Sequence, residues 1–159
     1  MKNFIALIFI FVLGMQMAFA ETLPPKGYYD VKPEDYPVLF EYMNNYAKQL
    51  FEEFNPGILW ANHGGGVGTY TINKDGTISD IPDYLDEHVC TRYLKKLILK
   101  TTPPPFPKEL EADKIKIQLW LFRNKYTEID LDYDQYHECA DISLSKDHQR
   151  KSWFKKKKK

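Results

Sequence analysis

The acidic segment from residue 130 to residue 141 has the residue types that could bind a metal ion. Asp130, Asp132, Asp134 and Asp141 stand at positions 1, 3, 5 and 12 of an EF-hand-like register, and carboxylate oxygens suit Ca²⁺. Position 6 is Gln135, where the calcium loop needs glycine for its sharp turn, and position 12 is aspartate instead of the usual glutamate. We therefore favour an acidic, solvent-facing strand edge and keep a secreted calcium-binding factor, or a small enzyme that uses this segment, as the alternative.

Two cysteines, each preceded by a histidine at a spacing of two, offer another chemistry. His88 with Cys90 and His137 with Cys139 supply the nitrogen and sulfur ligands of a zinc site. Residues two apart on a helix point in very different directions, so His88 and Cys90 are poorly placed to share one ion. Two cysteines in an oxidising compartment instead favour one disulfide, Cys90–Cys139, with two buried free thiols as the other outcome.

The run His63-Gly64-Gly65-Gly66 is similar to the oxyanion loop of lipases and esterases. No G-x-S-x-G nucleophile turn accompanies it, and neither common phosphate-binding glycine motif is present. We therefore expect a connecting loop there. The sequence offers no catalytic constellation and no cofactor motif, which favours a binding protein over an enzyme.

The N-terminus predicts export. Lys2 precedes an apolar run, Phe4 to Leu13, and Ala18-Phe19-Ala20 has the small-x-small pattern of a cleavage site. We expect a signal peptide over residues 1–20, cleaved after Ala20, with a retained signal anchor as the alternative. The run is shorter than the roughly 20 residues that span a membrane.

Charge divides the remaining chain into two parts. Residues 21–145 carry 13 basic and 21 acidic side chains, a net charge of −8. Residues 146–159 carry 8 basic side chains and 1 acidic side chain, a net charge of +7. The acidic body argues against nucleic acid as the partner. We expect a basic, disordered tail over 144–159, and Lys151–Lys159 could attach weakly to a membrane surface.

Hydrophobic periodicity predicts one α+β domain over residues 35–143, preceded by a linker over 21–34. Two adjacent apolar rows predict a first helix from near Asp35 to Phe54, and both rows belong to the core. The pattern then predicts a hairpin over 68–79, a helix over 83–100, a proline stop at 103–107 and a strand over 115–121. Residues 126–133 predict a fourth strand, paired with 115–122 through a tight turn at 123–125.

This order of elements resembles the C-terminal domain of the TonB/TolA family. The resemblance covers residues 42–122 and rests on Trp60, the hairpin T-Y-T-I-N-K-D-G-T-I at 69–78, the helix opened by Leu85-Asp86, and P-P-P-F-P at 103–107 before the alternating strand. It implies a small antiparallel sheet of three to four strands with two helices packed on one face. It also implies a non-catalytic, periplasmic domain of a Gram-negative bacterium that binds other proteins.

The resemblance carries partner-binding residues onto the last strand of the motif. Lys116, Gln118 and Trp120 stand on the face opposite Ile115, Ile117 and Leu119, and Trp60 is a further candidate. The expected partner is a periplasmic or outer-membrane protein. A cleavable signal and a linker that spans at most about 40 Å are too little to bridge two membranes, so we do not expect the chain to transmit energy as TonB does.

Overall fold

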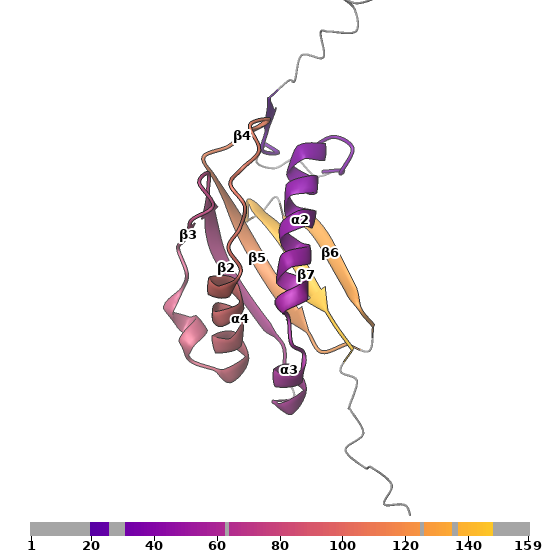
Figure 1. Ribbon diagram of the computed structural model, residues 1–159, viewed down its shortest axis with the longest axis vertical. Helices are drawn as coiled ribbons and strands as arrows, with labels where there is room; N and C mark the ends of the chain where they lie inside the picture. The colour runs from indigo at the N-terminus through magenta and orange to yellow at the C-terminus, as the bar shows by residue number, and fades with distance from the viewer. Residues whose placement is uncertain (1–19, 26–30, 63, 125, 135–136, 148–159) are drawn as a thin grey trace, which may run out of the picture.

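The computed structural model describes residues 20–25, 31–62, 64–124, 126–134 and 137–147. The predicted signal peptide before Ala20, His63, Lys125 and the basic segment 148–159 lie outside these residues. Within them the fold is α+β, which confirms the predicted class (Figure 1). Its main sheet has five strands in the order β3-β2-β5-β7-β6: β3 (Ile78–Ser79), β2 (Gly66–Asn73), β5 (Lys114–Phe122), β7 (Cys139–Ser145) and β6 (Glu128–Asp134).

Helices α2 (Pro37–Glu53) and α4 (Val89–Lys100) cover one face of this sheet (Figure 1). The two apolar rows of α2 are the reason, because side chains three and four apart share a helix face. Leu39, Met43 and Leu50 in α2 and Leu94 and Ile98 in α4 are fully buried against the strands. The short helix α3 (Gly57–Ala61) follows α2 and contacts α4. None of the helices in the described residues is long and apolar enough to cross a membrane.

Strand β5 runs through the middle of the sheet. Its alternation is strict: Ile115, Ile117, Leu119 and Leu121 are each at most 1% exposed, and the residues between them point the other way. β2 pairs antiparallel along one edge of β5, and β7 pairs parallel along the other edge.

The predicted pairing of the fourth strand was wrong. β6 does not lie beside β5, because β7 separates them, so the sheet is mixed and has five strands instead of three or four antiparallel ones. Burial explains the order. Ala140, Ile142 and Leu144 of β7 are fully buried, as an interior strand requires, whereas Ile129 and Leu131 of β6 are only half-buried and suit an edge.

The beginning of the predicted linker is part of the folded domain. β1 (Glu21–Thr22) pairs in parallel with β4 (Leu110–Glu111). The Glu21 carboxylate accepts hydrogen bonds from the backbone N–H groups of Val38 (3.0 Å) and Leu39 (2.7 Å) at the start of α2. The N-cap residue of that helix, Tyr36, supplies no side-chain capping hydrogen bond to it, so Glu21 takes the place of a local cap.

The hairpin turn and the proline segment pack on each other. Gly76 adopts a φ of +83°, which glycine tolerates and other residues rarely do. A Cβ atom at Gly76 would lie 2.6 Å from the carbonyl oxygen of Pro103, so a side chain has no room there. The Tyr42 hydroxyl donates to the carbonyl oxygen of Pro104 at 3.0 Å and ties the same segment to α2.

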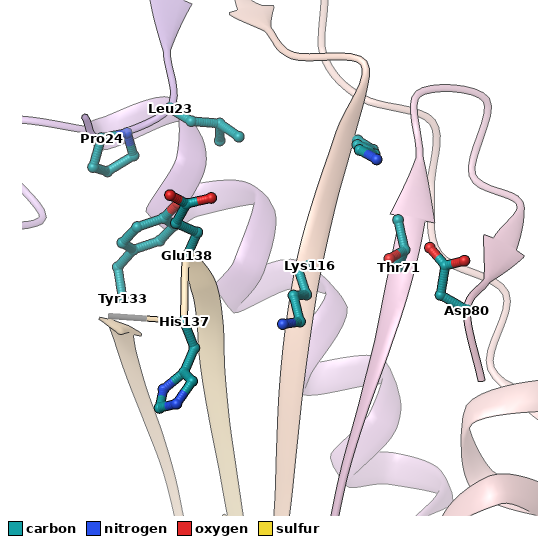
Figure 2. A pocket seen from close by; sticks show the side chains of 9 residues that line it. Leu23, Pro24, Thr71, Asp80, Lys116, Tyr133, His137 and Glu138 are labelled. Carbon is teal, nitrogen blue, oxygen red and sulfur yellow. The ribbon is translucent and has the colours of Figure 1, made fainter. Parts of the chain in front are cut away.

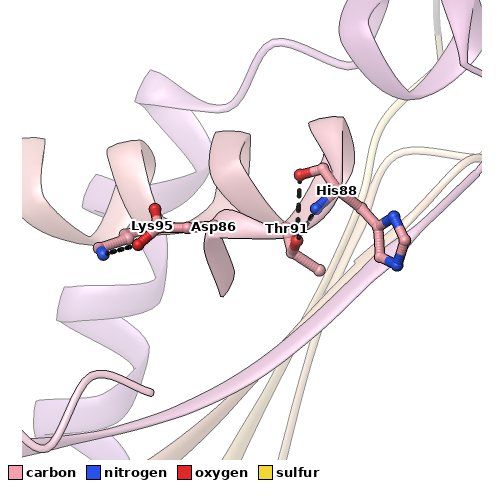
Figure 3. A network of polar contacts seen from close by, with 4 residues as sticks. All are labelled: Asp86, His88, Thr91 and Lys95. Carbon is pink, nitrogen blue, oxygen red and sulfur yellow. Dashed lines mark hydrogen bonds and ion pairs between the residues drawn. The ribbon is translucent and has the colours of Figure 1, made fainter. Parts of the chain in front are cut away.

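The second predicted helix, 83–100, is interrupted. A 3₁₀ turn, η1 (Asp83–Asp86), precedes α4, and His88 between them is in extended conformation. Figure 3 shows what fixes this corner: the Thr91 hydroxyl accepts from the His88 backbone N–H (3.3 Å) and donates to the His88 carbonyl (3.0 Å). Lys95 pairs with Asp86 at 2.5 Å and holds η1 against the helix.

Candidate binding surface

The face of the sheet opposite α2 and α4 is the candidate functional surface, and we call it the open face. It is formed by every second residue of the strands, whose neighbours in sequence point into the core. Across the sheet these residues are Val67, Thr69 and Thr71 of β2; Lys116, Gln118, Trp120 and Phe122 of β5; Cys139, Asp141 and Ser143 of β7; and Glu128, Asp130, Asp132 and Asp134 of β6.

The structure brings three of the four proposed partner-binding residues together. Lys116, Gln118 and Trp120 form a row along β5, with Lys116 exposed and the other two half-exposed. The Trp120 ring stacks on that of Phe122, with centroids 6.0 Å apart and planes at 3°. Trp60 is not in this row: it lies in α3, where the Arg123 guanidinium sits 5.1 Å from the centre of its ring.

An acidic row borders the open face. Asp132 of β6 lies directly opposite Asp141 of β7. Asp130 and Asp134, two residues before and two residues after Asp132, lie on the same face of β6. Burial, followed by repulsion from Asp134 and Asp132, raises the pKa of Asp141 to about 6. The buried Oδ1 atom of Asp141 has no hydrogen-bond partner among the described groups, which agrees with the poor solvation that raises this pKa.

The raised pKa has a consequence for stability. Between the ordinary value of 3.8 and about 6, the folded chain keeps the Asp141 proton more tightly than the unfolded chain does. The contribution of Asp141 to the free energy of unfolding is therefore present below this range and is lost as the pH rises through it.

The predicted calcium register does not form a loop. Asp130, Asp132 and Asp134 alternate along β6, and Asp141 belongs to the next strand, so the segment is a β-hairpin. Among the residues that the structure describes, no three His, Cys, Asp or Glu side chains are placed to hold one metal ion. The geometry gives no support to the calcium alternative.

A cavity of about 700 Å³ lies at the end of the sheet where β5 and β7 begin (Figure 2). Lys114 and Lys116 of β5 and Thr71 of β2 line it, and Figure 2 shows Glu138 and Asp80 on opposite sides of Lys116. The remaining lining residues are Leu23, Pro24, Tyr133 and His137.

Two features of the polar rim of this cavity are an unusual backbone conformation and a contact between a histidine and a carboxylate. Asp80 and Glu138 are the two non-glycine residues with positive φ (55° and 52°) in the described part of the chain. His137 Nδ1 lies 2.5 Å from the Asp134 carboxylate. The described lining brings together cations, carboxylates, a histidine and a hydroxyl that can hydrogen-bond a polar ligand or partner, and no nucleophile with a hydrogen-bonded base stands among them.

The predicted disulfide Cys90–Cys139 is not formed, and both cysteines are free and buried. The physical reason is the sheet between them. Cys90 lies in the first turn of α4 and belongs to the core under the helices, whereas Cys139 is on the open face opposite Lys116. The Cys139 thiol donates to the His137 carbonyl at 3.2 Å, and burial raises its pKa. The zinc alternative fails for the same reason, and His88 is exposed whereas Cys90 is buried.

Some residues of this surface were not predicted from the sequence. Phe122 and Val67 extend the row at Trp120 and were missed, although the alternation that selects Trp120 continues to Phe122. The sheet-end cavity could not be found in this way, because its lining comes from the N-terminal segment, β2, β5 and the turn between β6 and β7.

Comparison of the chain with protein-family models, with curated proteins and with solved structures finds no match.

Proposed function

We propose that this chain is a non-catalytic protein-interaction module of the bacterial periplasm, whose open face binds an envelope or outer-membrane-associated protein. One observation carries the proposal: a sheet whose helices cover only one face presents Lys116, Gln118 and Trp120 side by side on its central strand. A half-exposed tryptophan beside hydrogen-bonding and charged groups is the composition of a protein-binding hot spot.

The order of elements supports the likeness to the TonB/TolA C-terminal domain. β2, β3, α4 and β5 follow in sequence, the strands β3-β2-β5 are antiparallel neighbours, and α4 contacts β2 on the helix-covered face. This unit is the hairpin, helix and strand on which the resemblance rests. The likeness, together with the predicted signal peptide, supports a periplasmic location and a protein partner.

The mode of binding that we propose differs from strand addition beside the last strand of the motif. β7 occupies the second edge of β5 over seven residue pairs, from Lys116–Cys139 to Phe122–Ser145. A partner peptide has no free backbone to pair with at β5. The residues of β5 that remain accessible are the open-face side chains, so recognition occurs through the face. The module does not transmit force, since its predicted linker is short and begins inside the fold.

Matched variants test the proposal. Affinity capture from a periplasmic and outer-membrane extract is compared for the wild type, Lys116→Gln and Trp120→Ala, with Lys96→Gln as the control on the exposed side of α4. We expect Trp120→Ala to weaken the affinity for a specific partner by about 30-fold and Lys116→Gln to weaken that affinity less. Lys96→Gln should leave the affinity unchanged. A partner that all three variants retain would rule out the open face.

A further inference from the structure

The wall of the cavity at the end of the sheet carries two lysines that no carboxylate pairs with. Lys114 and Lys116 stand two residues apart on β5, so their side chains share a face of the sheet, and both are exposed. Neither forms an ion pair with a carboxylate of the described residues. Two unpaired ammonium groups in a cavity of about 700 Å³, the size of a small-molecule site, favour a ligand with an anionic group.

Thr71 places a hydroxyl beside these cations. Thr71 lines the same cavity although it is only 6% exposed, and its hydroxyl has no hydrogen-bond partner among the described groups. The residue pairs with Lys116 on one side of β2 and with Ser79 on the other. A hydroxyl that is withdrawn from bulk water gains from a hydrogen bond to a ligand, so Thr71 supplies a second polar contact.

A carboxylate stands at the far end of this row. Asp80 follows Ser79 directly, and Figure 2 shows Thr71 between Lys116 and Asp80. Among the described residues, the Asp80 carboxylate accepts one long hydrogen bond, at 3.4 Å from the Ser79 hydroxyl. Glu138, on the other side of Lys116, already interacts with another group of the chain. Asp80 is therefore the carboxylate that can accept hydrogen bonds from a cationic group of the ligand.

The spacing of the strands sets the length of the ligand. Adjacent strands lie about 4.8 Å apart, so β3 and β5, with β2 between them, are separated by about 10 Å. An extended peptide advances by about 3.5 Å per residue, so three residues span about 10 Å. A single amino acid covers about a third of this separation.

We propose that the sheet-end cavity binds a short peptide with free termini, about three residues long. Lys114 and Lys116 bind the C-terminal carboxylate, and Asp80 accepts hydrogen bonds from the N-terminal ammonium group. The Thr71 hydroxyl hydrogen-bonds to the peptide backbone between the two ends. The carboxylates on either side of the lysines repel ligands with several negative charges, such as nucleotides. Recognition of both free termini fixes the direction and the length of the peptide.

This inference does not depend on the protein-binding role of the open face, with which it shares only Lys116. Trp120 stands four residues further along β5, about 13 Å from Lys116. Trp120→Ala should therefore weaken a protein partner and leave peptide binding unchanged, whereas Thr71→Val should do the reverse. Each proposal can fail without the other.

Titration with trialanine, followed by the amide chemical shifts of the protein, tests the proposal. The protein is residues 21–159, which contains every described helix and strand. We expect a Kd of about 100 μM, with the largest shifts at the residues around Thr71, Asp80 and Lys116. Trialanine amide and N-acetyltrialanine each lack one terminal charge and should each bind about tenfold more weakly. Free alanine and inorganic phosphate should also bind more weakly, because neither can contact the lysines and Asp80 together.

Matched variants assign the two ends of the peptide. Asp80→Asn keeps a residue type that tolerates positive φ, and it should weaken trialanine about tenfold while leaving N-acetyltrialanine, which has no ammonium group, unchanged. Lys114→Gln should weaken trialanine and leave its amide unchanged. Thr71→Val should weaken trialanine about threefold. Thr69→Val, on the same face of β2 but outside the cavity, is the control and should have no effect.

Three results would overturn the proposal. One is the absence of shifts at about 5 mM trialanine, a concentration far above the expected Kd. Another is equal affinity for trialanine and its amide, or for trialanine and phosphate. The third is an Asp80→Asn variant that loses as much affinity for N-acetyltrialanine as for trialanine, because Asp80 would then not bind the N-terminus.

Discussion

Glu21 should stabilise the domain although it lies sixteen residues before the helix that it caps. Its two carboxylate oxygens accept hydrogen bonds from Val38 and Leu39, at 3.0 and 2.7 Å. The helix N-terminus carries partial positive charge, so these are charge-assisted bonds at a favourable place in the helix dipole. Replacing a capping side chain by alanine costs about 1 kcal/mol, and the charge and partial burial raise this to about 2 kcal/mol for Glu21→Ala.

The loss can be measured by urea and thermal unfolding of the chain from residue 21. A change of about 2 kcal/mol corresponds to a fall in Tm of roughly 6–10 °C for a domain of this size. Glu21→Gln keeps one acceptor oxygen without the charge and should lose about half as much. Glu34→Gln, an exposed glutamate in the same N-terminal segment, is the control and should be neutral. If Glu21→Ala unfolds within about 0.3 kcal/mol of the wild type, the capping argument is wrong.

Three further predictions follow from the same structure. In the wild type, the free energy of unfolding should fall by about 1 kcal/mol between pH 4 and 6, a value that is reduced because Asp141 is partly exposed. Asp141→Asn should remove this fall. Asp130 faces Ser143, so Asp130→Asn is the control and should leave the fall in place. Equal pH slopes for the two variants would contradict this. Alkylation of the unfolded, non-reduced protein followed by mass spectrometry should show Cys90 and Cys139 both modified, and a species with neither modified would refute their placement on opposite faces. Gly76→Ala should cost about 2 kcal/mol or more, because it combines positive φ with a clash at Pro103, and a neutral result in urea unfolding would contradict that geometry.

The hairpin, the helices and the central strand could be predicted because their signals are local. Asn73–Gly76 marks a turn, the apolar rows of α2 have helical spacing, and residues 115–121 alternate strictly. Each of these patterns is confirmed in the structure. The break before α4 was missed, because it depends on side-chain hydrogen bonds at His88 and Thr91.

The order of the last two strands could not be predicted from adjacency in sequence. Consecutive strands usually pair, which favoured β6 beside β5. The structure instead places β7 there, where Ala140, Ile142 and Leu144 are fully buried, whereas Ile129 and Leu131 of β6 are only half-buried at the edge of the sheet. The cysteines show the same limit: their number favoured a disulfide, but whether they can meet depends on which side of the sheet each one faces.

The candidate surface was predictable only in part. Alternation along β5 correctly placed Lys116, Gln118 and Trp120 opposite the core, because parity within a strand is a local property. It could not indicate that β7 would close the second edge of β5, nor that Trp60 would lie in α3. The face, and not the edge, therefore became the proposed binding site only once the pairing of distant strands was known.

Site-specific photocrosslinking in the native cell tests the central proposal most directly. A benzophenone amino acid replaces Gln118 on the open face or, as the control, Lys96 on the exposed side of α4. We expect position 118 to yield a discrete adduct with one envelope protein, and position 96 to yield none. No adduct at position 118, or the same adducts at both positions, would contradict a binding site on the open face.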